Sequence, residues 1–156
     1  MATINVRGEE VWKRIRERLG KKALVRAGIL EDATNGETKE PIAPYAAANE
    51  YGTANIPPRP FLRQTYKTCN RAWIDGLARM LRENRSPDAA LKLTGRRMAE
   101  DIQATIRSNM QPSNSTATSL AKAKKVDGGE SGETMTPGTL IDTGSMLRAI
   151  DYEVAE

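Results

Sequence analysis

The chain has 156 residues, which is typical of one domain over residues 1–156, and a net charge of +4 from 24 basic and 20 acidic residues. One cysteine, Cys69, and no histidine exclude intramolecular disulfides, Cys/His zinc sites and Ser-His-Asp or Cys-His catalysis within one chain. No catalytic motif remains, so we expect neither an enzyme nor a cofactor. There is no membrane-length apolar run and no signal-peptide pattern. We therefore expect synthesis in a cytoplasm and no membrane partner.

The first third of the chain predicts a helix, a strand and a short helix. Apolar residues at helical spacing predict the first helix over residues 8–20, namely Val11, Trp12, Ile15 and Leu19. Residues 22–30 predict a strand, in which we interpret Gly28 as a bulge or a site of close backbone contact. Residues 31–44 indicate irregular structure with a loop or hairpin turn, and the alanine-rich residues 45–51 predict the short helix.

A proline-rich arm follows this short helix. Gly52 is the predicted helix end, because glycine adopts a positive φ at little cost. Pro57, Pro58 and Pro60 fix φ and lack backbone donors, so residues 55–60 should form a stiff, extended segment. The arm would orient the two halves of the chain or present a preformed edge to a neighbour.

Two long amphipathic helices are predicted after the arm, over residues 61–84 and 87–109. Their short connection predicts an antiparallel hairpin. Ser86 can cap the second helix and Pro87 suits its first position. Gly95 costs about 1 kcal/mol relative to alanine inside a helix, so we interpret it as a point of close contact with another helix.

The last third combines a polar stretch with a second structured segment. Residues 111–138 predict a long flexible loop, which is either a plain loop or a segment that neighbouring subunits order. Thr143 can cap a short helix that ends near residue 149. Residues 150–154 alternate apolar and polar side chains, as a half-buried strand does, and their natural partner is the strand at 22–30. The predicted class is α+β, with a small antiparallel sheet packed against the helical hairpin.

Two motifs occur in order, one at the arm and one near the end of the chain. The first consists of Asn49, Glu50, Tyr51, Gly52, Thr53, Ile56, Pro57, Pro58, Arg59, Pro60, Phe61 and Leu62. The second spans residues 140–150 and includes Asp142, Thr143 and Gly144. Together they resemble the tail-completion, or neck, proteins of long-tailed double-stranded DNA bacteriophages, and the resemblance covers residues 43–154.

The resemblance implies a structural role in the virion, at the neck or head-proximal end of the tail. Such proteins act as homo-oligomeric rings, here six-fold or twelve-fold, that join the tail to the portal or connector around the DNA channel. The implied partners are portal, connector, tail-tube or terminator proteins, with incidental contact to packaged DNA. No catalytic residue is carried over. The candidate docking residues are Asn49, Glu50, Tyr51, Gly52, Ile56, Pro57, Pro58, Arg59, Pro60, Phe61, Asp142, Thr143 and Gly144.

Several interpretations stay open at this stage. Arg59 is either an intersubunit ion-pair donor or a solvated side chain. A basic nucleic-acid-binding module is the alternative function, and an enzyme with paired carboxylates is a third. Cys69 is interpreted as a packing residue rather than a reactive thiol. Basic residues of the first long helix form either a solvated face or a phosphate-binding ridge: Arg63, Lys67, Arg71, Arg79 and Arg82. Candidate DNA or partner contacts in the loop are Lys122, Lys124 and Lys125.

Overall fold

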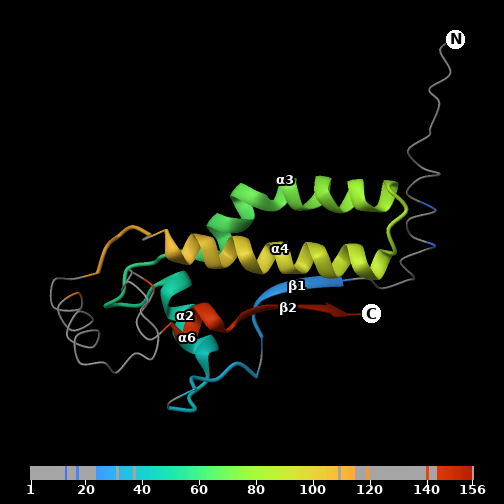
Figure 1. Ribbon diagram of the computed structural model, residues 1–156. Helices are drawn as coiled ribbons and strands as arrows, with labels where there is room; N and C mark the ends of the chain where they lie inside the picture. Colours follow the sequence, from blue (N-terminus) through green and yellow to red (C-terminus); the bar gives the residue numbers. More distant parts are fainter. Residues whose placement is uncertain are drawn as a thin grey trace, which may run out of the picture.

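The computed structural model describes residues 13, 17, 24–30, 32–36, 38–108, 110–114, 119, 140 and 144–155. Its elements are, in chain order, β1 (Leu24–Ile29), α2 (Ile42–Tyr51), α3 (Phe61–Arg82), α4 (Pro87–Arg107), α6 (Ser145–Arg148) and β2 (Ile150–Ala155) (Figure 1). The predicted α+β class, with an antiparallel two-stranded sheet and a long helical hairpin, is confirmed.

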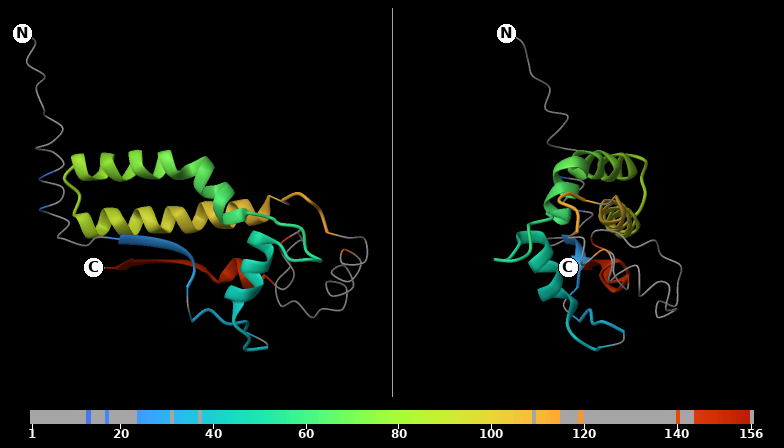
Figure 2. Two further views of the ribbon diagram at one scale, coloured as in Figure 1. Left: turned by 180° about the vertical axis from the view of Figure 1, so that it is seen from behind. Right: turned by 90° about the vertical axis from the view of Figure 1, so that its left-hand side faces the viewer.

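The elements form three layers, with α4 in the middle. α3 packs on one side of α4 and the sheet packs on the other side, as the two opposite views show (Figures 1 and 2). α2 and α6 gather at the C-terminal end of α4, where β2 begins. The continuous apolar core lies at this end and includes Ile42, Ala46, Phe61, Ala99, Ile102, Ile106, Met110, Leu140, Met146, Leu147 and Ile150.

The sheet pairs its two strands in an uninterrupted antiparallel register. Pairing runs from Leu24 opposite Ala155 to Ile29 opposite Ile150, and Gly28 lies opposite Asp151 within it. There is therefore no bulge at Gly28, and among the described residues no atom lies within 4 Å of a Cβ built there. The interpretation as a bulge is wrong, and no described residue makes the close contact that was the other interpretation.

Gly95 allows α4 to approach the sheet closely. A Cβ on Gly95 would lie 2.9 Å from Tyr152 Cγ and 3.0 Å from Val25 Cγ1. The predicted close contact therefore exists, but the prediction of a helix as the partner is wrong. The reason is the three-layer arrangement, in which α4 is covered by α3 on one face and by β1 and β2 on the other.

The helices α2 and α4 each contain a proline in the first turn. Ser86 caps α4 by accepting a hydrogen bond from the Ala89 N–H at 3.2 Å, which confirms its predicted role. α2 begins at Ile42, so the prediction of irregular structure is wrong at residues 42–44. Pro44 lies in the first turn, where an amide N–H has no intrahelical partner to lose.

Polar contacts join α3 to α4 beside their apolar seam. The Thr65 hydroxyl lies 2.7 Å from both the Phe61 carbonyl oxygen and the Thr105 hydroxyl. A hydroxyl that bonds the preceding turn often bends a helix, and the first turns of α3 do tilt toward α2 (Figure 2). Farther along, the Trp73 indole N–H donates to Asp101 Oδ2 at 2.8 Å.

Some predictions fall outside the described residues. Of the helix predicted at 8–20, only Lys13 and Glu17 are described, and both are helical. Of the loop predicted at 111–138, only residues 111–114 and 119 are described. Of the helices in the described ranges, none has the length and apolar character to span a bilayer.

Candidate functional site at the α2–α3 joint

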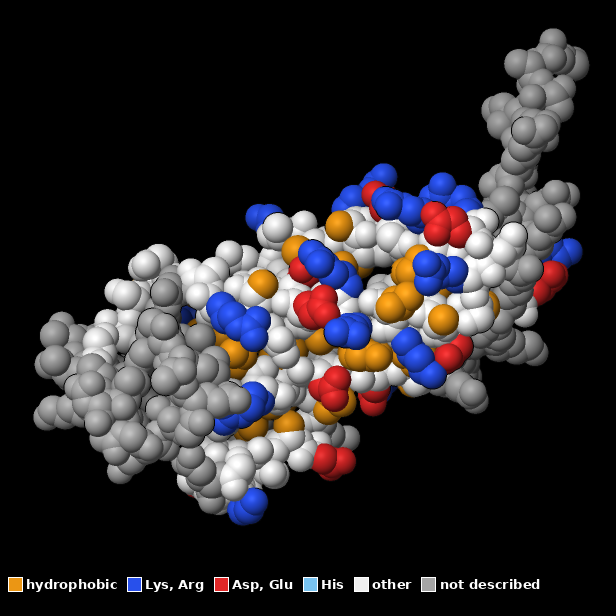
Figure 3. Space-filling view, viewed as in Figure 1, with side chains coloured by type: hydrophobic (Ala, Val, Ile, Leu, Met, Phe, Trp, Pro, Cys, Tyr) orange, Lys and Arg blue, Asp and Glu red, His pale blue; other side chains and the backbone are white. Residues whose placement is uncertain are grey.

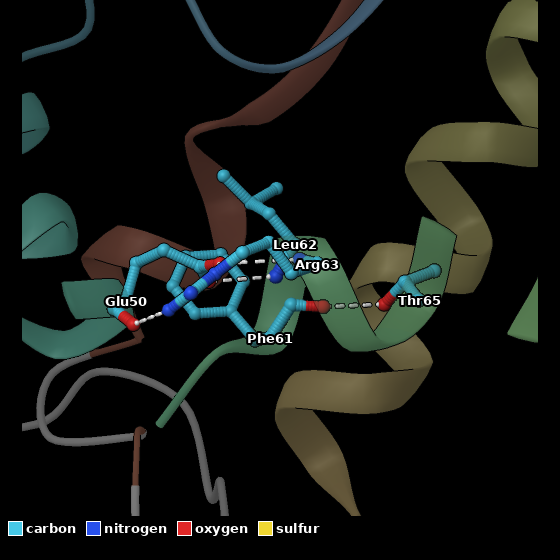
Figure 4. Close-up of polar contacts among 5 residues, drawn as sticks. All are labelled: Glu50, Phe61, Leu62, Arg63 and Thr65. Carbon is cyan, nitrogen blue, oxygen red and sulfur yellow. Dashed lines mark hydrogen bonds and ion pairs between the residues drawn. The ribbon is translucent and has the colours of Figure 1, made fainter. Parts of the chain in front are cut away.

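A buried carboxylate lies at the centre of the joint between α2 and α3. Glu50, in the last turn of α2, is 2% exposed. Its Oε2 accepts a hydrogen bond from the Leu62 N–H at 2.8 Å, and its Oε1 accepts one from the Arg63 N–H at 3.1 Å (Figure 4). The carboxylate of one helix therefore caps the N-terminus of the next.

The local sequence explains why α3 needs a cap from elsewhere. Pro60 occupies the N-cap position and has no side-chain hydrogen-bonding group. The first amides of a helix have no intrahelical acceptor, and the positive end of the helix dipole lies there. A carboxylate satisfies both needs, so Glu50 does for α3 what a serine or aspartate at the N-cap position would ordinarily do.

Arg63 completes the joint by pairing with the same glutamate. Its Nε lies 2.9 Å from Glu50 Oε1, and its Nη2 donates to the Glu50 carbonyl oxygen at 2.7 Å. The guanidinium also lies over the Tyr51 ring, 5.0 Å from the ring centre. The buried charge of Glu50 is thus paired and hydrogen-bonded, as a buried carboxylate requires.

The backbone of the turn between the helices is also fixed. The Asn49 side chain donates to the Tyr45 carbonyl oxygen at 2.9 Å, and the Asn49 carbonyl oxygen accepts from the Arg59 N–H at 2.7 Å. Gly52 has a φ of 80°, and a Cβ there would lie 2.9 Å from the Ile56 carbonyl oxygen. Gly52 ends α2 as predicted, although its ψ of 170° differs from that of the left-handed cap.

Arg59 is buried within the subunit. It is 6% exposed, its Nε donates to the Pro112 carbonyl oxygen at 2.8 Å, and its Nη2 donates to the Ser113 carbonyl oxygen at 3.3 Å. Arg59 is therefore not a solvated side chain, and two of its donors are already used inside the subunit. It attaches the arm to the residues that follow α4.

The candidate docking residues of the first motif divide into an inward set and an outward set. We call Asn49, Glu50, Arg59 and Phe61 the inward set, because all four are buried. We call Tyr51, Pro57 and Pro58 the outward set, because all three are exposed. Gly52, Ile56 and Pro60 are partly buried between the two sets.

The second motif is described only in part. Gly144 is buried, has a φ of 74° and precedes α6, which packs against α2. Asp142 and Thr143 lie outside the described residues, as do Lys122, Lys124 and Lys125. The structure thus connects the end of the second motif to the joint through α2, and the other residues stay predictions.

Two features of the site were missed by sequence reasoning. The cap that Glu50 provides could have been suspected, because Pro60 precedes a strongly helical segment and offers no side-chain acceptor. The inward position of Arg59 had no such signal, since a residue between prolines belongs to no periodic pattern. Within the described ranges, no group of three or more Cys, Asp or Glu side chains is arranged to hold a metal ion.

Comparisons with known protein families, with curated proteins and with solved structures find no match to this chain.

Proposed function

We propose that the chain is a structural protein of the head–tail junction of a tailed bacteriophage. It forms a ring that completes the tail or joins it to the portal or connector around the DNA channel. The proposal rests on the resemblance of the two motifs. The observation that carries it further is the division of the first motif into the inward set and the outward set.

The inward set holds the outward set in a fixed geometry. Glu50 bonds two amides and a guanidinium of α3, and Arg59 bonds the residues after α4. These contacts hold the exposed prolines, Pro57 and Pro58, in a defined position. A surface that is ordered before it binds loses little chain entropy on docking, which suits an assembly protein.

Tyr51 is the most exposed large side chain in the outward set. It is 69% exposed, yet the Arg63 guanidinium over its ring restricts its position. Tyrosine is enriched at interface centres, because it offers a large rigid surface with a polar tip. We assign Tyr51, Pro57 and Pro58 to the contact with the next subunit or with the portal-side partner.

Ring formation follows from the type of contact. A head-to-tail contact between the outward set of one subunit and a different surface of the next closes into a ring when the rotation allows it. The ring would have six or twelve subunits and would lie in the virion neck. Its neighbours would be the portal or connector on one side and the tail tube or terminator on the other.

The test uses phage particles that carry Tyr51→Ala or Pro57→Ala. Electron microscopy should show unjoined heads and tails, and native mass spectrometry of the purified variants should show fewer rings. Tyr45→Ala is the matched control, because Tyr45 is an exposed tyrosine of the same helix outside the motif. Normal, infectious particles from both outward variants would overturn the proposed role of the outward set.

A further inference from the structure

The helix α3 carries an excess of positive charge. α3 contains five basic residues and one acidic residue, so its net charge of +4 equals that of the whole chain. We call its basic residues the α3 ridge: Arg63, Lys67, Arg71, Arg79 and Arg82. Figure 3 shows basic side chains grouped along the edge of the molecule that α3 forms in Figure 1. A few acidic side chains lie among them in the same view (Figure 3).

The side chains of the α3 ridge are exposed, and most of them are not neutralised by a strong ion pair. All five side chains are exposed, and Lys67, Arg79 and Arg82 form no ion pair with any described residue. Arg71 pairs with Asp75 at 3.1 Å, but both side chains are largely exposed, and such pairs are weak in water. Arg63 is the exception, because its guanidinium forms an ion pair with the buried carboxylate of Glu50.

Three of the six other exposed residues on α3 have hydrogen-bond donors in their side chains, and the remaining three are Ala72, Ile74 and Asp75. Gln64, Tyr66 and Thr68 are exposed on α3, whereas Ile74 is its one exposed large aliphatic side chain. Interfaces between proteins have apolar centres from which charged residues are depleted. Interfaces with nucleic acid are more polar and more positive, and glutamine, threonine and tyrosine contact phosphates there.

We propose that the α3 ridge binds the phosphate backbone of duplex DNA without reading its sequence. From Arg63 to Arg82 the ridge extends for about 28 Å, at a rise of 1.5 Å per residue. One turn of duplex DNA is about 34 Å long, so the ridge can contact several phosphates at once. Lys67, Arg71, Arg79 and Arg82 supply the four phosphate contacts.

The experiment measures binding of the purified full chain to a random-sequence DNA duplex at several salt concentrations. Four contacts predict a slope of log K against log salt of about −3.6, or a loss of about 150-fold between 50 and 200 mM salt. Lys67→Gln with Arg82→Gln removes two contacts, so the loss should fall to about 12-fold. Duplexes of different sequence should bind equally.

A matched control removes the same number of charges elsewhere. Arg26→Gln with Arg96→Gln lowers the net charge by the same amount, from the sheet and from α4, and both arginines are exposed partners of exposed acids. This control should keep the slope of the original protein. Thermal unfolding of both double variants establishes that each is folded before binding is compared.

Three outcomes would overturn the proposal. The first is that the protein does not bind duplex DNA at 50 mM salt. The second is that the control variant loses as much of the salt slope as the ridge variant does. The third is that polyglutamate displaces the duplex at the same concentration of charge, which would favour an acidic protein surface as the partner. The test does not depend on the proposed junction role. If the protein does not bind duplex DNA but particle joining still requires Tyr51, only the proposal for the α3 ridge fails. If the protein binds duplex DNA but particle joining does not require Tyr51, only the proposed role of the outward set fails.

Discussion

Replacing Glu50 should destabilise the protein more than replacing any exposed acid, because one carboxylate serves three donors. Glu50→Ala removes the acceptor of the Leu62 and Arg63 amides and the partner of the Arg63 guanidinium. An amide that loses its acceptor in a partly buried site costs about 1–3 kcal/mol. The freed Arg63 is 59% exposed and can be solvated, so its loss adds little. We expect Glu50→Ala to lower the free energy of unfolding by about 3 kcal/mol.

Glu50→Gln separates the charge of the cap from its shape. The amide oxygen can still accept from one helix amide, but the interaction with the helix dipole and the ion pair with Arg63 are lost. The helix-dipole interaction contributes about 0.3–1 kcal/mol near a surface and up to about 2 kcal/mol when partly buried. We therefore expect Glu50→Gln to lower the free energy of unfolding by about 1.5 kcal/mol, which is less than the loss expected for Glu50→Ala.

Urea denaturation followed by circular dichroism measures these differences, with Glu100→Ala as the control. Glu100 is an exposed partner of Arg96 on α4, and such pairs contribute about 0.3–0.5 kcal/mol. The slope of the denaturation line should stay constant, so that shifts of the midpoint report stability. If Glu50→Ala cost no more than Glu100→Ala, the carboxylate would not act as the cap of α3, and the account of the joint would be wrong.

The remaining predictions concern three glycines and the cysteine. Gly95→Ala should destabilise by about 1–2 kcal/mol, because overpacking against Tyr152 exceeds the gain in helix propensity. Gly76→Ala, where a Cβ meets no described atom within 4 Å, should instead stabilise by up to about 1 kcal/mol in the same thermal unfolding experiment, and equal effects at the two sites would contradict the packing argument. Gly52→Ala should destabilise by about 1–3 kcal/mol in urea denaturation, because its positive φ and its contact with the Ile56 carbonyl oxygen both oppose a side chain, and a neutral result would refute the strain. Burial, and then the charge of Asp101, raise the pKa of the Cys69 thiol, so iodoacetamide should modify the folded protein more slowly than free cysteine at pH 8, and equal rates would contradict this direction.

The sequence predicted the elements that depend on local periodicity. The three- and four-residue spacing of Leu62, Thr65 and Cys69 suffices to predict α3, and the signals at Ser86 suffice to begin α4. The pairing of β1 with β2 was predictable because only two stretches had strand character. The helices need only the nearest few residues to be specified, whereas the strand pairing joins residues more than 100 positions apart and was predicted by elimination.

Other features depend on how the elements stack, which no local pattern encodes. Gly95 indicates that something packs closely on α4, but its partner depends on which of two faces the sheet covers. Glu50 lies twelve and thirteen residues from the amides it caps, so the contact exists only after the turn at Gly52 has reversed the chain. The α3 ridge was visible in the sequence as five basic residues, yet only the folded structure shows that Arg63 and Arg71 pair with acids while Lys67, Arg79 and Arg82 pair with none among the described residues.

The division of the motif changes what a defective variant would mean. Arg59 was a candidate for contact between subunits, but its guanidinium is bonded to Pro112 and Ser113 of the same chain. Arg59→Ala would therefore destabilise the fold of the subunit. Unjoined particles from this variant would not distinguish a destabilised subunit from a lost contact between subunits. Tyr51 gives a cleaner result, because its exposed ring contributes only about 0.5–1 kcal/mol through Arg63. A docking role is thus established by outward variants that stay folded and fail to assemble, and inward variants report the rigidity of the joint.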